Sequence, residues 1–231
     1  MKTKKILILD YSRDRSGTPN IKQWMPVDAD TSSLFINSKD SFPPGLIDKN
    51  FTHVIHSGSA HSITGTAPFD EKAEKFIQNC RDRDVTQMGI CYGHQLVCRA
   101  LLGRQSVQAS PNKLEAGWED IYFNDEAINI LNLGASEKIW QHHFDEVIEL
   151  PKGSELLARN AHTEIQAYIN YEHRLFGTQF HPEVDRKAGN EVFLRDRDLL
   201  EEYNCNVEKI VQEGPSIEAG KVFFDFFLND F

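Results

Sequence analysis

Cysteine is scarce in this chain of 231 residues, and its few cysteines are not spaced for a metal. The four are Cys80, Cys91, Cys98 and Cys205, which form neither a C-x-x-C pair nor a zinc spacing. The histidines offer no ligand spacing either, so the sequence predicts no metal and no cofactor. This cysteine usage is typical of a reducing compartment, and we expect a cytoplasmic protein.

Long hydrophobic runs and an excess of basic charge are also missing. No stretch approaches the roughly twenty apolar residues that span a bilayer. Residues 6–10, behind a basic start, are too short for the apolar core of a signal peptide and are better explained as a buried strand. The formal net charge of −10 and the pI near 5.4 argue against nucleic acid or an anionic membrane as the main partner.

Two nucleotide-binding motifs are absent as well. The chain has neither the phosphate-cradling G-x-x-x-x-G-K-[ST] pattern nor the dinucleotide-binding G-x-G-x-x-G pattern. We therefore expect that the protein does not bind and use a nucleotide by itself.

The most informative stretch that is present is Gly89-Ile-Cys91-Tyr-Gly93-His-Gln95. Apolar and β-branched residues precede it at 85–90, which indicates a buried strand. A helical pattern follows it and stops at Gly103, a natural C-terminal capping residue. The cysteine is therefore expected in a sharp turn between a strand and a helix.

A cysteine in such a turn has the geometry of a nucleophile. Gly89 and Gly93 permit unusual backbone angles and a close approach of the strand to the helix. The unpaired N–H groups and the dipole of the helix N-terminus favour the thiolate of Cys91 over the thiol. The alternative is that Cys91 is a small buried hydrophobe between two glycines.

His181-Pro182-Glu183 is the second short motif, and it follows another strand pattern at residues 175–180. A thiolate nucleophile needs a base to accept its proton and a group that holds this base in the right tautomer. His181 and Glu183 are suitable residue types for these two roles. Taken alone, the triplet is a weak signal, and a surface turn is the better interpretation.

Together the two motifs resemble the signature of the class I glutamine amidotransferase domain, a G-x-C-x-G-x-Q elbow followed later by H-P-E. The resemblance implies that Cys91 is the nucleophile, His181 the base and Glu183 its orienting partner. It also implies an α/β fold, a flavodoxin-like three-layer sandwich with a mostly parallel central sheet.

The likeness extends to two further segments. Residues 51–59 resemble the strand that ends at the family's oxyanion-binding loop, which implies an oxyanion hole from Gly58, Ser59 and the backbone N–H of Tyr92. Here Gly58-Ser59-Ala60 replaces the two glycines and proline of many members. The sequence therefore does not identify which backbone N–H group completes the oxyanion hole. Residues 138–147 resemble the segment that lines the glutamine pocket.

Several residues are expected to bind the substrate on the same resemblance. They are Gln95, His142, His143, Phe144 and Asp145. Because His142 and His143 are adjacent, they should point in different directions, and we expect at most one of them to reach the site. The alternative for Gln95 is a polar side chain that faces solvent on its helix.

Strand and helix patterns alternate along the chain, which indicates a parallel sheet covered on both faces and a single domain over residues 1–231. Residues 11–44 are rich in polar residues and proline, with a short helix expected near residues 21–25. The rest of this segment, with Trp24, Met25 and Phe35, is interpreted as a loop or a cover over the site. The aromatic tail at residues 219–228 should dock on the sheet as a helix, a partner-binding helix being the alternative.

Three functions of different classes follow. The first is a glutaminase that hydrolyses the γ-amide of glutamine and passes ammonia to a separate synthase subunit. The second is a hydrolase of γ-glutamyl peptides or conjugates, because the chain is also similar to stand-alone γ-glutamyl peptidase-like members of the superfamily. The third is a non-catalytic binding protein, which an intact set of Cys91, His181 and Glu183 disfavours.

Overall fold

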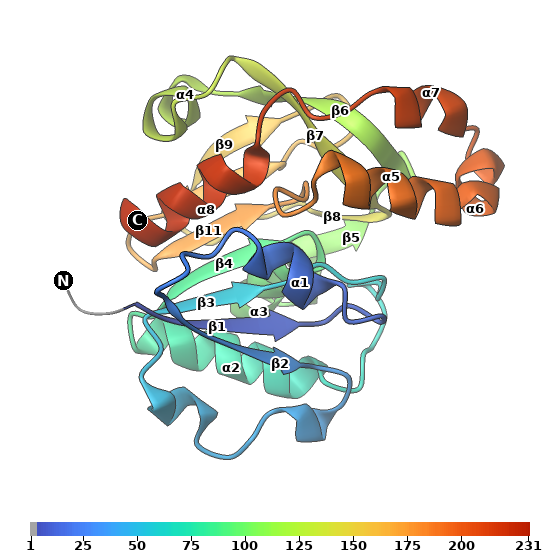
Figure 1. Ribbon diagram of the computed structural model, residues 1–231. Helices are drawn as coiled ribbons and strands as arrows, with labels where there is room; N and C mark the ends of the chain where they lie inside the picture. Colours follow the sequence, from blue (N-terminus) through green and yellow to red (C-terminus); the bar gives the residue numbers. More distant parts are fainter. Residues whose placement is uncertain (1–3) are drawn as a thin grey trace.

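A nine-stranded sheet runs through residues 4–231, the part of the chain described by this computed structural model (Figure 1). The strand order is β2-β1-β3-β4-β11-β10-β9-β6-β7. These strands are β1 (Lys5–Asp10), β2 (Asp30–Phe35), β3 (His53–His56), β4 (Thr86–Ile90), β6 (Glu115–Phe123), β7 (Ser136–His143), β9 (Glu155–Arg159), β10 (Ala167–Asn170) and β11 (Leu175–Thr178). A separate ribbon pairs β5 (Val107–Ala109) with β8 (Asp145–Val147).

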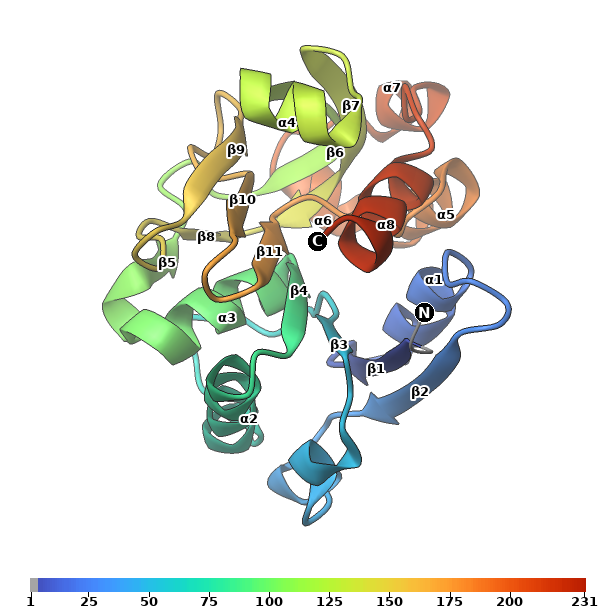
Figure 2. The ribbon, with the colours of Figure 1, turned by 90° about the vertical axis from the view of Figure 1, so that its left-hand side faces the viewer.

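Helices cover both faces of the sheet and make the three layers that the resemblance implied. The helices are α1 (Gly17–Lys22), α2 (Asp70–Asp82), α3 (Tyr92–Leu102), α4 (Asp125–Leu131), α5 (Arg186–Arg195), α6 (Arg197–Glu202), α7 (Val207–Gln212) and α8 (Ala219–Asn229). Short 3₁₀ turns lie at Lys39–Ser41, Leu46–Lys49 and Arg104–Ser106. Figure 2 shows α2 and α3 on one side of the parallel strands and α1 and α8 on the other.

The alternation of side chains along β1 explains this layering. Ile6 and Ile8 enter the apolar cluster that contains the aromatic residues of α8. Leu7 and Leu9 enter the cluster formed with α2 and α3. Successive residues of a strand face opposite sides of the sheet, so a run that is apolar throughout requires a cover on both faces.

The parallel half of the sheet positions the two motifs. Strands β2, β1, β3, β4 and β11 are parallel neighbours, and Ile90 of β4 is paired with Thr178 of β11. The carboxyl ends of these strands lie at one edge, where Cys91 follows β4 and His181 follows β11 shortly after its end. Adjacent parallel strands therefore bring together two motifs that are distant in the sequence.

Strands β10, β9, β6 and β7 extend the sheet in antiparallel fashion. Beyond them, α5 and α7 pack on a third apolar cluster that includes Trp118, Trp140 and Phe193. This small additional core holds α5 and α6 beside the end of β7. The chain that follows the second motif thereby contributes a wall close to the site.

The tail is confirmed as a helix docked on the sheet, because the phenylalanines of α8 lie buried in the central cluster. In residues 11–44 the expected short helix is present, but at Gly17–Lys22 and not at residues 21–25, and the interpretation of the rest as a loop or a cover was wrong for residues 30–35. Part of the segment is α1, and part is β2, which pairs with all of β1. A polar strand suits this place because β2 is the edge of the sheet and is largely exposed.

Candidate active site

Cys91 lies in a sharp reversal between β4 and α3, with φ 49° and ψ −107°. This is a sparsely populated backbone conformation for a residue with a side chain, and such strain is found at functional turns. Its N–H donates to the Thr178 carbonyl at 2.8 Å, and its carbonyl accepts from the Gln95 N–H at 3.0 Å. The turn is thus tied both to β11 and to the first turn of α3.

The two glycines of the turn provide close packing, and the unusual backbone angle falls on the cysteine itself. A Cβ on Gly89 would lie 2.6 Å from the Gly93 carbonyl oxygen. A Cβ on Gly93 would overlap the His56 carbonyl oxygen. Positive φ belongs to Cys91 and to neither glycine, which refines the sequence interpretation.

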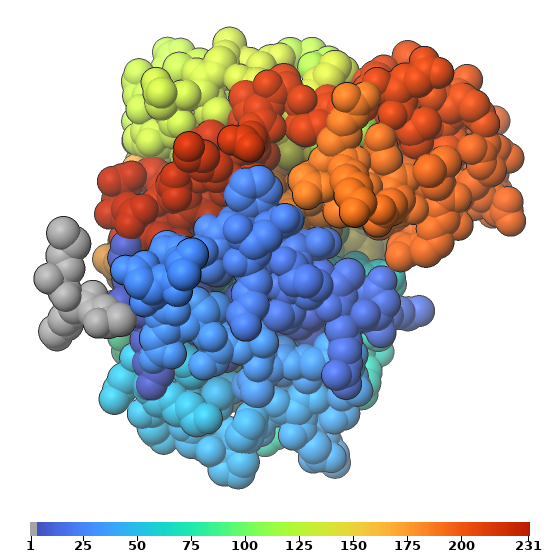
Figure 3. Space-filling view, in the orientation of Figure 1, coloured from blue at the N-terminus to red at the C-terminus, as the bar shows by residue number. Residues whose placement is uncertain are grey.

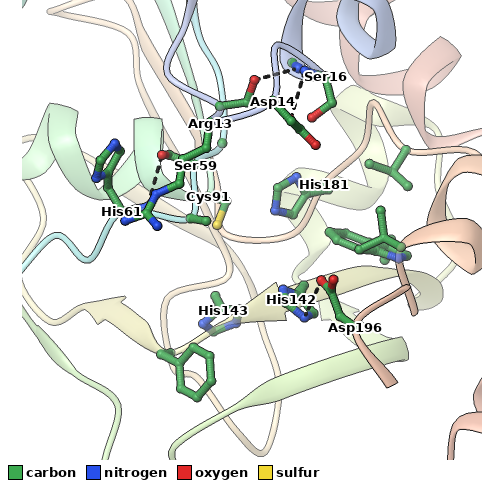
Figure 4. A pocket seen from close by; sticks show the side chains of 18 of the residues that line it. Arg13, Asp14, Ser16, Ser59, His61, Cys91, His142, His143, His181 and Asp196 are labelled. Atoms are coloured by element: carbon green, nitrogen blue, oxygen red, sulfur yellow. Dashed lines mark hydrogen bonds and ion pairs between the residues drawn. The ribbon is translucent and has the colours of Figure 1, made fainter. Parts of the chain in front are cut away.

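His181 and Glu183 form a hydrogen-bonded pair, with 2.7 Å between Nδ1 and Oε1. In Figure 4, the Cys91 sulfur and the His181 ring face the same cavity. Burial by itself lowers the pKa of His181, but the Glu183 carboxylate and the neighbouring Cys91 thiol raise the pKa above its ordinary value. The His181 ring thus lies between a carboxylate partner and a thiol, the arrangement that the two sequence motifs predicted.

Two neighbours restrict the His181 ring. The Trp140 ring meets it edge-on, with 4.8 Å between the ring centroids. Gly58 lies on another side, where a Cβ would be 2.6 Å from His181 Cε1. Only glycine therefore fits at position 58, even though its backbone φ is not in the left-handed region.

The segment predicted to form the oxyanion hole lies beside Cys91. Gly58 and Ser59 both line the cavity. Ser59 Oγ donates to the Tyr11 carbonyl at 2.8 Å and accepts from the His61 N–H at 3.1 Å, which fixes the loop. The Tyr92 hydroxyl donates to Asp70 at 3.1 Å, so its side chain is engaged elsewhere, and the predicted role of its backbone N–H at the start of α3 stays a prediction.

The cavity that contains Cys91 and His181 has a volume of about 700 Å³. The turn before α1 and the first residues of α1 form one wall through Ser12, Arg13, Asp14, Ser16, Gly17 and Asn20. Helices α5 and α6 form another through Val192, Arg195, Asp196, Asp198 and Leu199. Trp24, Met25 and Phe35 are not among the lining residues, so these three side chains do not form the cover over the site that the sequence suggested.

Gln95 is buried and lines the cavity, which contradicts the alternative of a solvent-facing side chain. Its Nε2 donates to the Asp145 carbonyl at 2.7 Å and to Gln179 Oε1 at 3.0 Å. The Asp145 carboxylate accepts from Ser62 Oγ at 2.6 Å and from the Ile63 N–H at 2.9 Å. These contacts hold the main chain of the predicted glutamine pocket.

His143 joins the same network through both ring nitrogens. Its Nδ1 lies 3.0 Å from the Asp145 carbonyl oxygen and its Nε2 lies 2.7 Å from Glu115 Oε2. Burial by itself raises the pKa of Glu115, but its hydrogen bonds with His143 and Asn160 lower the pKa below its ordinary value. Sequence reasoning missed Glu115, although a glutamate at a buried strand position was a signal that it needed a partner.

His142 also lines the cavity, so the expectation that at most one of the adjacent histidines reaches the site was wrong. The pair lies at the end of β7, the last strand of the sheet, and the cavity can therefore contact both of its faces. The His142 ring stacks on Trp140, and burial lowers its pKa to about 4. Phe144, the next residue, is 36% exposed at the cavity wall and packs edge-on against Tyr203.

One group of side chains has the composition of a metal site. Ligand atoms of Glu115, His143 and His162 lie within 4.8 Å of one another. However, Glu115 already accepts hydrogen bonds from His143, Gln166 and Asn160. The 2.7 Å separation of His143 Nε2 and Glu115 Oε2 is that of a hydrogen bond, so the cluster fits a hydrogen-bonded network better than a metal centre.

The sequence profile of the family "Glutamine amidotransferase class-I" matches residues 24–199, most of the chain and both motifs. This chain belongs to the class I glutamine amidotransferase family. Among its relatives, a glutamine-hydrolysing GMP synthase subunit from Sulfurisphaera tokodaii is 39% identical over 152 residues, 65% of this chain and 77% of the relative. The corresponding GMP synthase subunit from Sulfolobus acidocaldarius is 34% identical over 146 residues, 63% and 74% of the two chains.

Solved structures agree on the fold. A glutamine amidotransferase from Thermotoga maritima superposes with a TM-score of 0.76 over 92% of this chain and 90% of its own, at 17% identity.

In this amidotransferase chain, no helix of residues 4–231 is long and apolar enough to cross a membrane. The family match ends inside α6, so α7 and α8 lie beyond it.

Proposed function

We propose that this class I glutamine amidotransferase hydrolyses the γ-carboxamide of glutamine through a thioester on Cys91. The observation that supports it most is the strained Cys91 beside a His181–Glu183 pair with a 2.7 Å hydrogen bond. The thiolate attacks the γ-carbonyl carbon, and a C–S bond forms as the carbonyl electron pair moves onto oxygen. The N–H groups of Gly58 and Tyr92 stabilise this oxyanion, at a few kcal/mol per donor.

Collapse of the intermediate breaks the C–N bond, and His181 protonates the leaving ammonia. The neutral imidazole then accepts a proton from water as the water attacks the γ-glutamyl thioester. Loss of the Cys91 thiolate releases glutamate. Glu183 keeps the His181 ring in the tautomer whose Nε2 can exchange the proton in both halves.

Transfer of the ammonia to a separate synthase subunit is the coupled function that the relatives suggest. Two of them bear the name of a glutamine-hydrolysing subunit of GMP synthase. The absence of nucleotide-binding motifs agrees with a partner that supplies the activated acceptor. The free cysteines of residues 4–231 are compatible with the cytoplasmic location expected from the sequence.

Hydrolysis of γ-glutamyl peptides or conjugates is the second candidate, and the size of the cavity favours it. Its volume of about 700 Å³ falls within the range typical of sites for drug-sized ligands, about 300–1,000 Å³. The wall from α5 and α6 provides Val192 and Leu199 next to charged residues, which suits a leaving group larger than ammonia. A non-catalytic role is disfavoured, because Cys91, His181 and Glu183 meet at one site.

A panel of leaving groups tests both candidates. The purified protein is given glutamine, glutathione, other γ-glutamyl conjugates and dipeptides, and glutamate release is measured. Strong glutamine turnover only after a synthase is added supports the first candidate. Fast cleavage of conjugates by the protein alone supports the second.

Val192→Trp sharpens the result, because a bulky side chain on α5 should slow the conjugates while leaving glutamine nearly unaffected. Leu194→Trp, at an exposed site on the same helix that does not line the cavity, is the matched control. No release of glutamate from any of these compounds by wild type, with or without a synthase, would refute the proposed chemistry.

A further inference from the structure

The carboxylate of Glu183 is held at only one of its oxygens. Oε1 accepts from His181 Nδ1 at 2.7 Å. Oε2 is buried and has no hydrogen-bond partner among the described residues. A carboxylate that orients a catalytic histidine must itself be held in place, so the position of Glu183 has to come from its main chain.

Two side chains from the other end of the sequence hold that main chain. Trp24 Nε1 donates to the Glu183 carbonyl oxygen at 3.0 Å. Gln23 Nε2 donates to the same oxygen at 3.1 Å. Both residues lie just after α1, about 160 positions before Glu183 in the sequence. One carbonyl thus accepts two donors that belong to a different layer of the fold.

The donors are themselves fixed. Trp24 packs against Gly220 of α8 so closely that any Cβ at position 220 would overlap the indole ring. It also packs on the large apolar cluster beneath α8. Gln23 Nε2 is shared with the Asn20 carbonyl at 3.1 Å. Figures 1 and 2 show α1 next to α8, and Figure 3 shows blue N-terminal residues against the red and orange C-terminal segments.

We propose that Gln23 and Trp24 are positioning residues for catalysis, which hold the Glu183 main chain so that its carboxylate orients His181. The proposal rests on the Cys91 chemistry proposed above. According to this proposal, the segment after α1 affects the reaction rate although it does not contact the substrate. The packing of α1 on α8 then helps to hold the active site in place. Neither residue lines the cavity, so substrate binding should not depend on them.

The test removes the two donors and keeps the shape of the side chains. Gln23→Leu and Trp24→Phe are each expected to lower kcat for glutamine about 3- to 10-fold, and the double variant about 10- to 100-fold, with KM nearly unchanged. Met25→Leu is the matched control, because Met25 packs on the same cluster and makes no hydrogen bond to Glu183. Thermal unfolding of each variant measures any structural loss, and Gln23→Leu alone serves if the double variant does not fold.

Two measurements distinguish a role in positioning Glu183 from a role in stabilising the fold. The groups that face His181 are Glu183, Cys91 and His142. If Glu183 becomes misplaced, the alkaline limb of the pH–rate profile should move to lower pH. In a Glu183→Ala background, the Gln23 and Trp24 substitutions should lower kcat no further, because they act through a residue that is already absent.

An equal loss of kcat in the Glu183→Ala background would overturn the proposal. So would an unchanged kcat in the double variant with the fold intact. These outcomes differ from a failure of the proposed function, in which wild type itself would release no glutamate.

Discussion

The two halves of the proposed catalytic site are built in different ways. Cys91 is held by its own neighbourhood, because β4, Gly89, Gly93 and the start of α3 all lie within a few residues of it. The His181–Glu183 pair is held by distant segments: Gly58 and Trp140 pack on the ring, and Gln23 and Trp24 hold the main chain. Local geometry can thus be read from one short motif, while the orientation of the base depends on the assembled fold.

Removal of the nucleophile should give the largest effect and tests the local half of this comparison. Cys91→Ser is expected to lower kcat at least about 10⁴-fold, because the hydroxyl has a far higher pKa and the same base cannot activate it. Glutamate release measures the loss, and circular dichroism checks the fold. A glutamine-analogue electrophile should label Cys91 in wild type and spare the other three cysteines. Equal labelling of all four cysteines would contradict the prediction that Cys91 is the most reactive thiol.

Substitution of the base should lower kcat more than substitution of its partner. His181→Ala is expected to lower kcat about 10³-fold, because the ring transfers protons in both half-reactions, while Glu183→Gln should cost about 10- to 100-fold. Single-turnover measurements of acylation and deacylation distinguish the two steps. If His181→Ala retains near-normal rates, another residue must be the base, and His143 would be tested first.

Alanine at two glycines sharpens the comparison further. Gly89→Ala places a methyl group against rigid backbone in the elbow, so we expect a loss of about 1–3 kcal/mol in the free energy of unfolding. Gly58→Ala places its methyl group against the His181 ring, so kcat should fall about 10-fold or more with a smaller loss of stability. Denaturant unfolding and kinetics on both variants check this. The reverse pattern would show that the elbow is more tolerant than the loop.

The smallest expected effect is the pH dependence of stability. Glu183 and Cys91 raise the pKa of His181 in the folded state despite its burial. The resulting stabilisation is fully present below the unfolded pKa of about 6.5 and is lost as pH rises through the higher folded value. Between pH 7 and 10, wild type should lose on the order of 1 kcal/mol more unfolding free energy than His181→Gln. Identical pH profiles would argue against the protonated pair.

Much of the site could be predicted because its signals are local. The apolar run before Cys91, the glycines around it and Gly103 at the end of α3 specify a strand, a turn and a helix within a short stretch. The aromatic spacing of the tail similarly predicted α8. The edge strand β2 was missed because its polar sequence carries no strand periodicity, and it is a strand only because β1 offers it a free edge.

The sequence by itself determined the residue types and local turns of the site: a cysteine between two glycines at a helix start and a histidine–proline–glutamate triplet after a strand. Only the tertiary structure decided which remote groups complete the site, including Gln23 and Trp24 on the Glu183 carbonyl, Glu115 under His143, and the α5–α6 wall of the cavity. The physical reason is the distance along the sequence over which each interaction acts. Backbone sterics and helix dipoles act over a few residues, whereas these contacts depend on strand order and layer packing, which bring distant parts of the chain together.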